Sequence, residues 1–138
     1  MAQAARPLPA GRKLALAAEI LAVYVRIRAL MRRIDVRAAV ARLREQGDVV
    51  RVEDDLSPFH TAARLGHAVA RTLAPLPTDA RCLARSLVLT RLLARRGIAS
   101  TLVIGVRPEP FEAHAWVEFE GIAVLPDDGG EFGRLTEL

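Results

Sequence analysis

Three residues whose side chains can do nucleophilic chemistry occur in a fixed order in the second half of the chain. Cys82 is the only cysteine, and it lies in segment 77–86, where a helix is expected to begin. His114 follows 32 residues later in segment 113–118, which has the pattern of a strand, and Asp127 comes 13 residues after His114. A thiol, an imidazole and a carboxylate can act as a nucleophile, its base and the group that orients the base. The sequence therefore predicts a cysteine hydrolase.

The predicted position of Cys82 favours the reactive form of its sulfur. A thiolate attacks a carbonyl and a thiol hardly does, while most free cysteine is protonated at neutral pH. The first turn of a helix presents unpaired N–H groups and a partial positive charge that stabilise a thiolate, and a neighbouring imidazolium does the same. Arg81 and Arg85 add positive charge nearby. The alternative is a structural role for Cys82, because free cysteines are among the most buried residues.

The composition fits one domain with an aliphatic core. Hydrophobic residues make up 51% of the 138 residues, and the aromatic ones are one Trp, one Tyr and four Phe. The 20 Lys and Arg exceed the 16 Asp and Glu, which gives a net charge of +4. The arginines follow helices without the interleaved aromatic side chains on which nucleic-acid bases stack. We therefore expect no nucleic-acid partner.

The sequence also argues against metal, cofactor and membrane functions. A single cysteine allows no internal disulfide and no Cys-rich zinc site, and His60 and His67 have no third ligand at metal spacing. No Gly-rich phosphate-binding loop of the Walker type occurs, so we expect no use of ATP and no cofactor. The apolar stretch 14–25 contains Glu19 and is followed by Arg26, so it is too short and too charged to span a bilayer. We expect a cytoplasmic protein.

The first 57 residues are predicted to be mainly helical. A helix over 12–34 carries an apolar stripe in alternating four- and three-residue steps, and a second helix over 36–46 has Asp35 as its N-cap. We expect 1–57 to be a region that docks a partner or the substrate and forms one compact unit with the rest. The alternatives are a first helix packed on its own domain or lying on a membrane surface. The stripe consists of Leu16, Ile20, Val23, Ile27, Leu30 and Ile34.

The catalytic core is predicted to lie in residues 58–138. A helix runs from Ser57-Pro58 to Thr72, and a central helix, apolar over most of its girth, follows over 80–96. The central helix is capped by Thr78 or Asp79 and ended by Gly97. The hydrophobic period then changes to two over 101–106, 113–119 and 122–125, which indicates three strands. Helices first and antiparallel strands last indicate an α+β fold.

A two-residue turn at Glu120-Gly121 sets the register of the last two predicted strands. Phe119 then pairs with Ile122, and counting back brings His114 opposite Asp127 on the same face of the sheet. Asp128 points to the other face by strand alternation, so Asp127 is the better candidate for orienting the imidazole. The alternative for this acidic segment is a solvated turn.

Three further residues near His114 are candidates for contact with a substrate. Trp116 and Glu118 lie two and four residues beyond His114, on the same strand face, and Phe111 lies in the loop before the strand. Trp116 either packs in the core or walls a substrate groove. Glu118 is placed to bind a backbone group or an arginine.

The segments around Cys82 and His114 resemble a known family. Cys82-Leu83-Ala84-Arg85-Ser86-Leu87 and Ala113-His114-Ala115-Trp116-Val117-Glu118 are similar to the transglutaminase-like cysteine proteases of lasso-peptide biosynthesis, which remove the leader from a ribosomally made precursor. The resemblance extends over about residues 59–125 and is most specific in 113–118. It implies a papain- or transglutaminase-like core with Cys82 as the nucleophile, His114 as the general base and acid, and Asp127 as the orienting group.

The resemblance also implies partners and leaves competing functions open. Because 1–57 shows no set of strands, we expect the split form, in which a separate leader-recognition protein delivers the precursor's leader peptide and a separate ATP-dependent cyclase closes the ring. One alternative is a transglutaminase-type thiol acyltransferase that uses the same three residues. The other is a noncatalytic peptide-binding module whose cysteine is structural.

Overall fold

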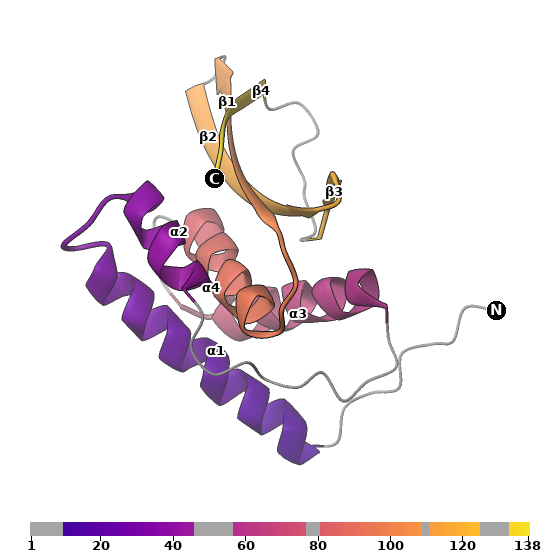
Figure 1. Cartoon of the computed structure of the whole chain (residues 1–138). Helices are drawn as coiled ribbons and strands as arrows, with labels where there is room; N and C mark the ends of the chain where they lie inside the picture. Colours follow the sequence, from indigo (N-terminus) through magenta and orange to yellow (C-terminus); the bar gives the residue numbers. More distant parts are fainter. Residues whose placement is uncertain (1–9, 46–56, 77–80, 109–110, 125–132) are drawn as a thin grey trace.

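The helices and the sheet occupy separate parts of the molecule (Figure 1). The computed structural model describes residues 10–45, 57–76, 81–108, 111–124 and 133–138. Four helices precede four strands in this part of the chain, which confirms the α+β fold. The elements are α1 (Ala10–Leu30), α2 (Val36–Arg44), α3 (Pro58–Leu73), α4 (Arg81–Arg95), β1 (Thr101–Pro108), β2 (Phe111–Phe119), β3 (Ile122–Ala123) and β4 (Gly133–Glu137).

Local capping interactions fix where the helices begin and end. The Asp35 carboxylate accepts a hydrogen bond from the Ala38 N–H at 2.8 Å at the start of α2. The Ser57 hydroxyl accepts one from the His60 N–H at 3.3 Å, and Pro58 occupies the first turn of α3. Gly97 has a φ of 71° after α4, a conformation that glycine adopts without strain. These starts and this end confirm the predictions, whereas the predicted caps of α4 at residues 78 and 79 lie outside the described residues.

The strands form one antiparallel sheet with the order β3-β2-β1-β4. Glu120 and Gly121 both have positive φ, 50° and 81°, as the two-residue turn between β2 and β3 requires. Phe119 pairs with Ile122, so the predicted register is confirmed over the described part of this hairpin.

Two predictions about the strands are corrected. β2 begins at Phe111, so Phe111 and Glu112 lie in the strand and not in a loop before it. β4 was not predicted, because its residues are mainly polar and exposed and have no alternating apolar pattern.

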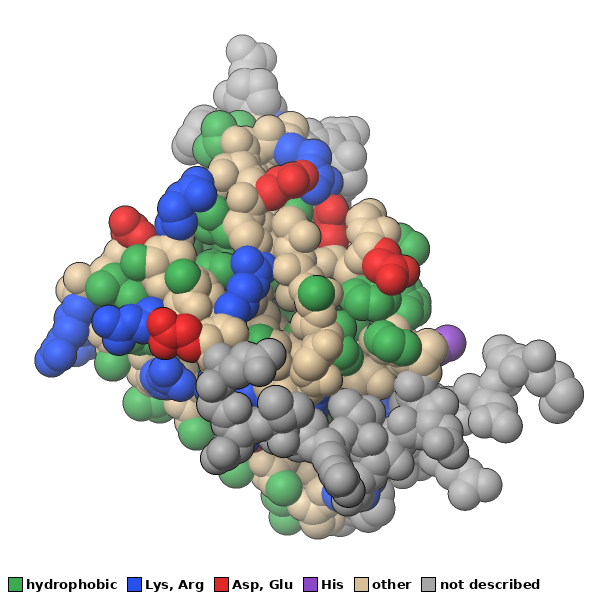
Figure 2. Space-filling model, viewed as in Figure 1, with side chains coloured by type: hydrophobic (Ala, Val, Ile, Leu, Met, Phe, Trp, Pro, Cys, Tyr) green, Lys and Arg blue, Asp and Glu red, His purple; other side chains and the backbone are tan. Residues whose placement is uncertain are grey.

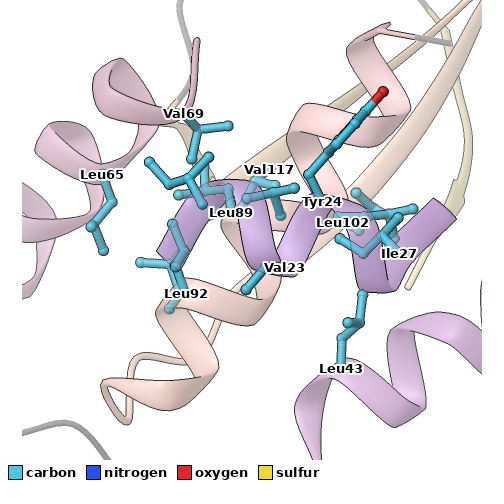
Figure 3. Packing of buried hydrophobic residues seen from close by; sticks show 14 of the residues in the cluster. Val23, Tyr24, Ile27, Leu43, Leu65, Val69, Leu89, Leu92, Leu102 and Val117 are labelled. Atoms are coloured by element: carbon cyan, nitrogen blue, oxygen red, sulfur yellow. The ribbon is translucent and has the colours of Figure 1, made fainter. Parts of the chain in front are cut away.

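The hydrophobic core is formed where α1, α2 and α3 pack around α4 and where α4 meets one face of the sheet (Figure 3). α4 lies at its centre, because it contacts the other three helices as well as β1 and β2. Its side chains are buried around most of the helix, as predicted for a central helix. The labelled core residues are Val23, Tyr24, Ile27, Leu43, Leu65, Val69, Leu89, Leu92, Leu102 and Val117.

Some apolar side chains of α1 are buried in the core and others are exposed at the surface. The predicted stripe packs inward at Leu16, Ile20, Val23 and Ile27, which are at most 9% exposed. Leu14 and Val25 are 73% and 65% exposed. The helix ends at Leu30, four residues earlier than predicted, so Ile34 lies outside it.

Charged side chains of both signs are interspersed with apolar ones on the face shown in Figure 2. Inside the helical part, Glu19 of α1 accepts hydrogen bonds from Arg95 at 2.6 Å and Arg96 at 3.0 Å, which joins α1 to the end of α4. None of the helices in the described part of the chain combines the length and hydropathy that a membrane crossing requires.

Candidate active site

Cys82 lies in the first turn of α4 and is half-buried. Ser86, one turn further along, donates a hydrogen bond from its hydroxyl to the Cys82 carbonyl at 2.8 Å. Thr90 repeats this contact with the Ser86 carbonyl at 2.8 Å, and both hydroxyl residues are fully buried. The backbone that carries the thiol is therefore held in a rigid, closely packed helix. Backbone N–H groups in the first turn of a helix have no partner within the helix and can bind a negatively charged group.

The helix that carries Cys82 packs against the strand that carries His114. Contacts between α4 and β2 are the most extensive that α4 makes with the sheet. Figure 1 shows the N-terminal end of α4 turned toward the sheet. The fold thus brings together the two elements from which the sequence predicted a thiol and an imidazole.

His114, Trp116 and Glu118 alternate along β2 and share one face of the strand. The imidazole of His114 stacks on the indole of Trp116, with ring centroids 5.8 Å apart and an interplanar angle of 26°. The indole N–H donates a hydrogen bond to Oε2 of Glu118 at 2.8 Å. Trp116 and Glu118 are both buried, at 7% and 8% exposure. The three side chains therefore form one connected row.

Arg134 of β4 completes this row. Its guanidinium donates to both carboxylate oxygens of Glu118, at 2.8 Å and 3.0 Å. These hydrogen bonds, with that from Trp116, lower the pKa of Glu118 although burial of the carboxylate opposes the shift. The same contacts with Glu118, and those with Glu137, raise the pKa of Arg134. Glu118 is therefore an anion held by an arginine of its own chain.

Gly105 of β1 makes room for the indole. It pairs with His114 across the two strands. A Cβ atom at Gly105 would lie 2.7 Å from Cη2 and 2.8 Å from Cζ3 of Trp116, and 3.0 Å from the Gly133 carbonyl oxygen. These distances are shorter than carbon atoms tolerate, so only glycine fits beneath the ring.

The opposite face of β2 belongs to the hydrophobic core. Val117 packs there in the same cluster as Leu89 of α4. His114 therefore projects from the face of β2 opposite to the one on which α4 packs. On the side away from β1, Glu118 and Phe119 of β2 pair with β3 in the described part of the chain, and the Val124 N–H adds a hydrogen bond to the Val117 carbonyl at 3.0 Å.

The structure describes only some of the other predicted site residues. Asp127 and Asp128 lie outside the described residues, so the orienting carboxylate stays a prediction. The backbone of Phe111 lies in β2. Arg134 and Gly105 were not among the predicted site residues. The glycine inside a strand was the one available signal, because such a residue indicates close approach of another group.

No cluster suited to a metal ion occurs among the described His, Cys, Asp and Glu residues. The polar row on β2 consists of an ion pair, an aromatic ring and an imidazole, which is suited to holding a base in a fixed orientation. Together with a half-buried thiol at a helix start, it offers the parts of an acyl-transfer site.

Known proteins share sequence similarity with this chain. Over 40 residues the chain is 52% identical to the microcin J25-processing protein McjB of Escherichia coli. The match covers 29% of this chain, and the chain spans 19% of the length of that relative. No solved structure matches the chain. The sequence model of the transglutaminase-like superfamily matches residues 21–138, most of the chain, and the protein therefore belongs to that superfamily.

Proposed function

We propose that this protein is a cysteine peptidase that removes the leader from a ribosomally made lasso-peptide precursor. The observation that carries the proposal is the position of Cys82 in the first turn of the central helix α4, packed against the strand that carries His114. The superfamily match supports thiol chemistry at this site, and the similarity to a microcin-processing protein supports a precursor peptide as the substrate.

The proposed reaction uses Cys82 and His114 as a thiolate–imidazolium pair. The thiolate attacks the carbonyl carbon of the amide that joins leader and core, and backbone N–H groups at the start of α4 bind the oxyanion. His114 protonates the departing amine of the core peptide, which leaves the leader as a thioester on Cys82. A water molecule, deprotonated by His114, then hydrolyses the thioester and releases the leader as a carboxylate. In this scheme Asp127 fixes the tautomer of the imidazole.

The two side chains of the proposed pair start from different sides of β2. α4 packs on the Val117 face of the strand, whereas His114 projects from the opposite face. We propose that the two side chains meet beyond the N-terminal end of α4, because Cys82 lies in the first turn of that helix.

The region 1–57 and the partners belong to the same proposal. Leu14 and Val25 leave apolar side chains exposed on α1. We propose that this surface docks the separate leader-recognition protein, with the ATP-dependent cyclase acting on the cleaved product.

Incubation of the protein with a precursor and a leader-recognition protein, followed by intact-mass measurement, tests the function. Loss of the leader's mass supports the peptidase. Addition of an amine's mass supports the acyltransferase alternative, and an unchanged precursor supports the noncatalytic module. Cys82→Ala and His114→Ala should abolish cleavage and leave the melting temperature nearly unchanged, whereas His67→Ala, at an exposed position on α3, should cleave normally. Asp127→Asn should slow cleavage more than Asp128→Asn.

A substrate-independent test addresses the pairing itself. Dibromoacetone alkylates a thiol and then a second nucleophile within reach of the short linker. Because Cys82 is the only cysteine, the first alkylation has one target. Peptide mapping should find Cys82 linked to His114. A linker attached to Cys82 and hydrolysed at its other end in every molecule would contradict the proposed pair.

A further inference from the structure

The imidazole of His114 is connected to β4 through two intermediate side chains. Trp116 stacks on the imidazole and donates its N–H to Glu118, and Arg134 binds both oxygens of that carboxylate. Arg134 is itself fixed, because its Nε donates to Glu137 at 2.9 Å. Each contact therefore limits the freedom of the next side chain.

The contacts leave Trp116 little choice of position. The backbone of Gly105 lies against the benzo edge of the ring, as the distances from a Cβ built at Gly105 show. The N–H is engaged by Glu118, and one face of the ring is engaged by His114. A buried indole whose N–H lost its acceptor would carry an unsatisfied donor, which is costly, so the carboxylate fixes the tilt of the ring.

Glu118 can serve as this acceptor only when its own charge is compensated. The carboxylate is buried, and an unpaired buried anion is strongly disfavoured. Arg134 supplies the compensating charge in bidentate geometry, which sets the plane of the carboxylate as well as its charge. Without Arg134, the carboxylate gains by turning toward water and away from Trp116.

We propose that Arg134 is a positioning residue for His114 that acts through Glu118 and Trp116. The inference rests on the proposed function, in which His114 is the base of a cysteine peptidase. It assigns Trp116 and Glu118 to the support of the base and not to contact with the substrate. A misplacement of catalytic groups by about 1 Å can cost on the order of 100-fold in rate, so a row of this kind affects the reaction without touching the peptide.

Trp116 is the only tryptophan, so its fluorescence tests the contacts directly. Emission excited at the red edge, at one fixed pH, should change in intensity when the ring stacked on the indole is replaced. His114→Gln should cause this change, whereas His60→Gln and His67→Gln, on α3, should not.

Arg134→Gln should reproduce most of the change in emission that His114→Gln causes, and Arg134→Lys should reproduce less of it. Leu135→Gln is the matched control, because Leu135 is the next residue of β4 and is 66% exposed. If Arg134 only stabilised the fold, Arg134→Gln would lower the melting temperature and leave the emission of Trp116 unchanged. Wild-type emission in folded Arg134→Gln would therefore overturn the inference.

The cleavage assay adds the kinetic readout. Arg134→Gln should lower kcat about 10-fold or more with little change in KM, because the substrate is bound but the base is misplaced. A rise in KM alone would overturn the inference and place Arg134 in substrate binding. If the wild-type protein cleaves no precursor, the proposed function fails. The fluorescence of Arg134→Gln then still decides whether Arg134 positions His114.

Discussion

The substitution Gly105→Ala tests whether the indole of Trp116 lies against the backbone of β1. The added methyl would lie 2.7 Å and 2.8 Å from two ring carbons of Trp116. Carbon atoms in contact prefer about 3.5–4.0 Å, so the overlap is roughly 1 Å. The ring cannot move freely, because it is hydrogen-bonded to Glu118 and stacked on His114. The added methyl would also lie 3.0 Å from the Gly133 carbonyl oxygen, so it meets a second close neighbour.

Overpacking of this kind typically costs about 1–3 kcal/mol, and the two fixed neighbours place this site toward the upper end of that range. For a domain of this size, each kcal/mol lowers the melting temperature by about 2–4 °C, so the expected fall is roughly 4–12 °C. Gly133→Ala is the matched control in the neighbouring strand. Its Cβ would lie 3.7 Å from the Val106 carbonyl oxygen, an ordinary contact, so the expected change is within about 0.5 kcal/mol.

Thermal and urea unfolding, followed by circular dichroism, measure both variants. A double-mutant cycle with Trp116→Phe adds a sharper test, because phenylalanine lacks the outer ring that carries both short contacts. Gly105→Ala should cost less in the Trp116→Phe background than in the wild type. Equal costs in the two backgrounds, or a Gly105→Ala protein as stable as the wild type, would refute the placement of the indole.

The remaining predictions concern stability. Because the pKa of Glu118 is lowered in the folded protein, its carboxylate stabilises the fold at pH values above the ordinary glutamate pKa, and this stabilisation is lost as the pH falls through the folded-state pKa. The urea midpoint should therefore drop in acid, and Glu118→Gln should weaken this drop. Glu19→Gln should lower the free energy of unfolding in urea by about 1 kcal/mol, because Arg95 and Arg96 at the C-terminal end of α4 lose the carboxylate that they share. Leu89→Ala, at a fully buried site, should cost about 2–5 kcal/mol, whereas Leu135→Ala, at an exposed site, should cost less than about 0.5 kcal/mol.

The helices were predictable because the signals that form them are local. Asp35 and Ser57 cap the helices that follow them, and apolar spacing identified the inward residues of α1. The predicted end of α1 was wrong for a reason of the same kind. Ile34 fits the apolar stripe, but Asp35 needs extended backbone to act as an N-cap and has a φ of −76° and a ψ of 172°. The chain therefore leaves the helix before the stripe ends.

β4 was not predictable from local signals. Its residues carry no alternating apolar pattern, and the strand exists because its backbone groups pair with those of β1. Arg134 lies on this strand, so its contact with Glu118 was not predictable either. By contrast, the turn at Glu120-Gly121 and the register of β2 with β3 followed from the turn residues alone.

The sequence predicted two possible roles for Trp116, packing in the core and forming the wall of a substrate groove. The contacts of Trp116 in the structure favour one of them. The benzo edge lies over Gly105, the N–H binds Glu118 and one face meets His114. The side chain is only 7% exposed, whereas a groove wall needs a free face on which a peptide can lie. These contacts favour packing, in which the ring lies against β1 and stacks on His114. A substrate of the proposed peptidase would then meet His114, which is less buried than Trp116, before it meets the indole.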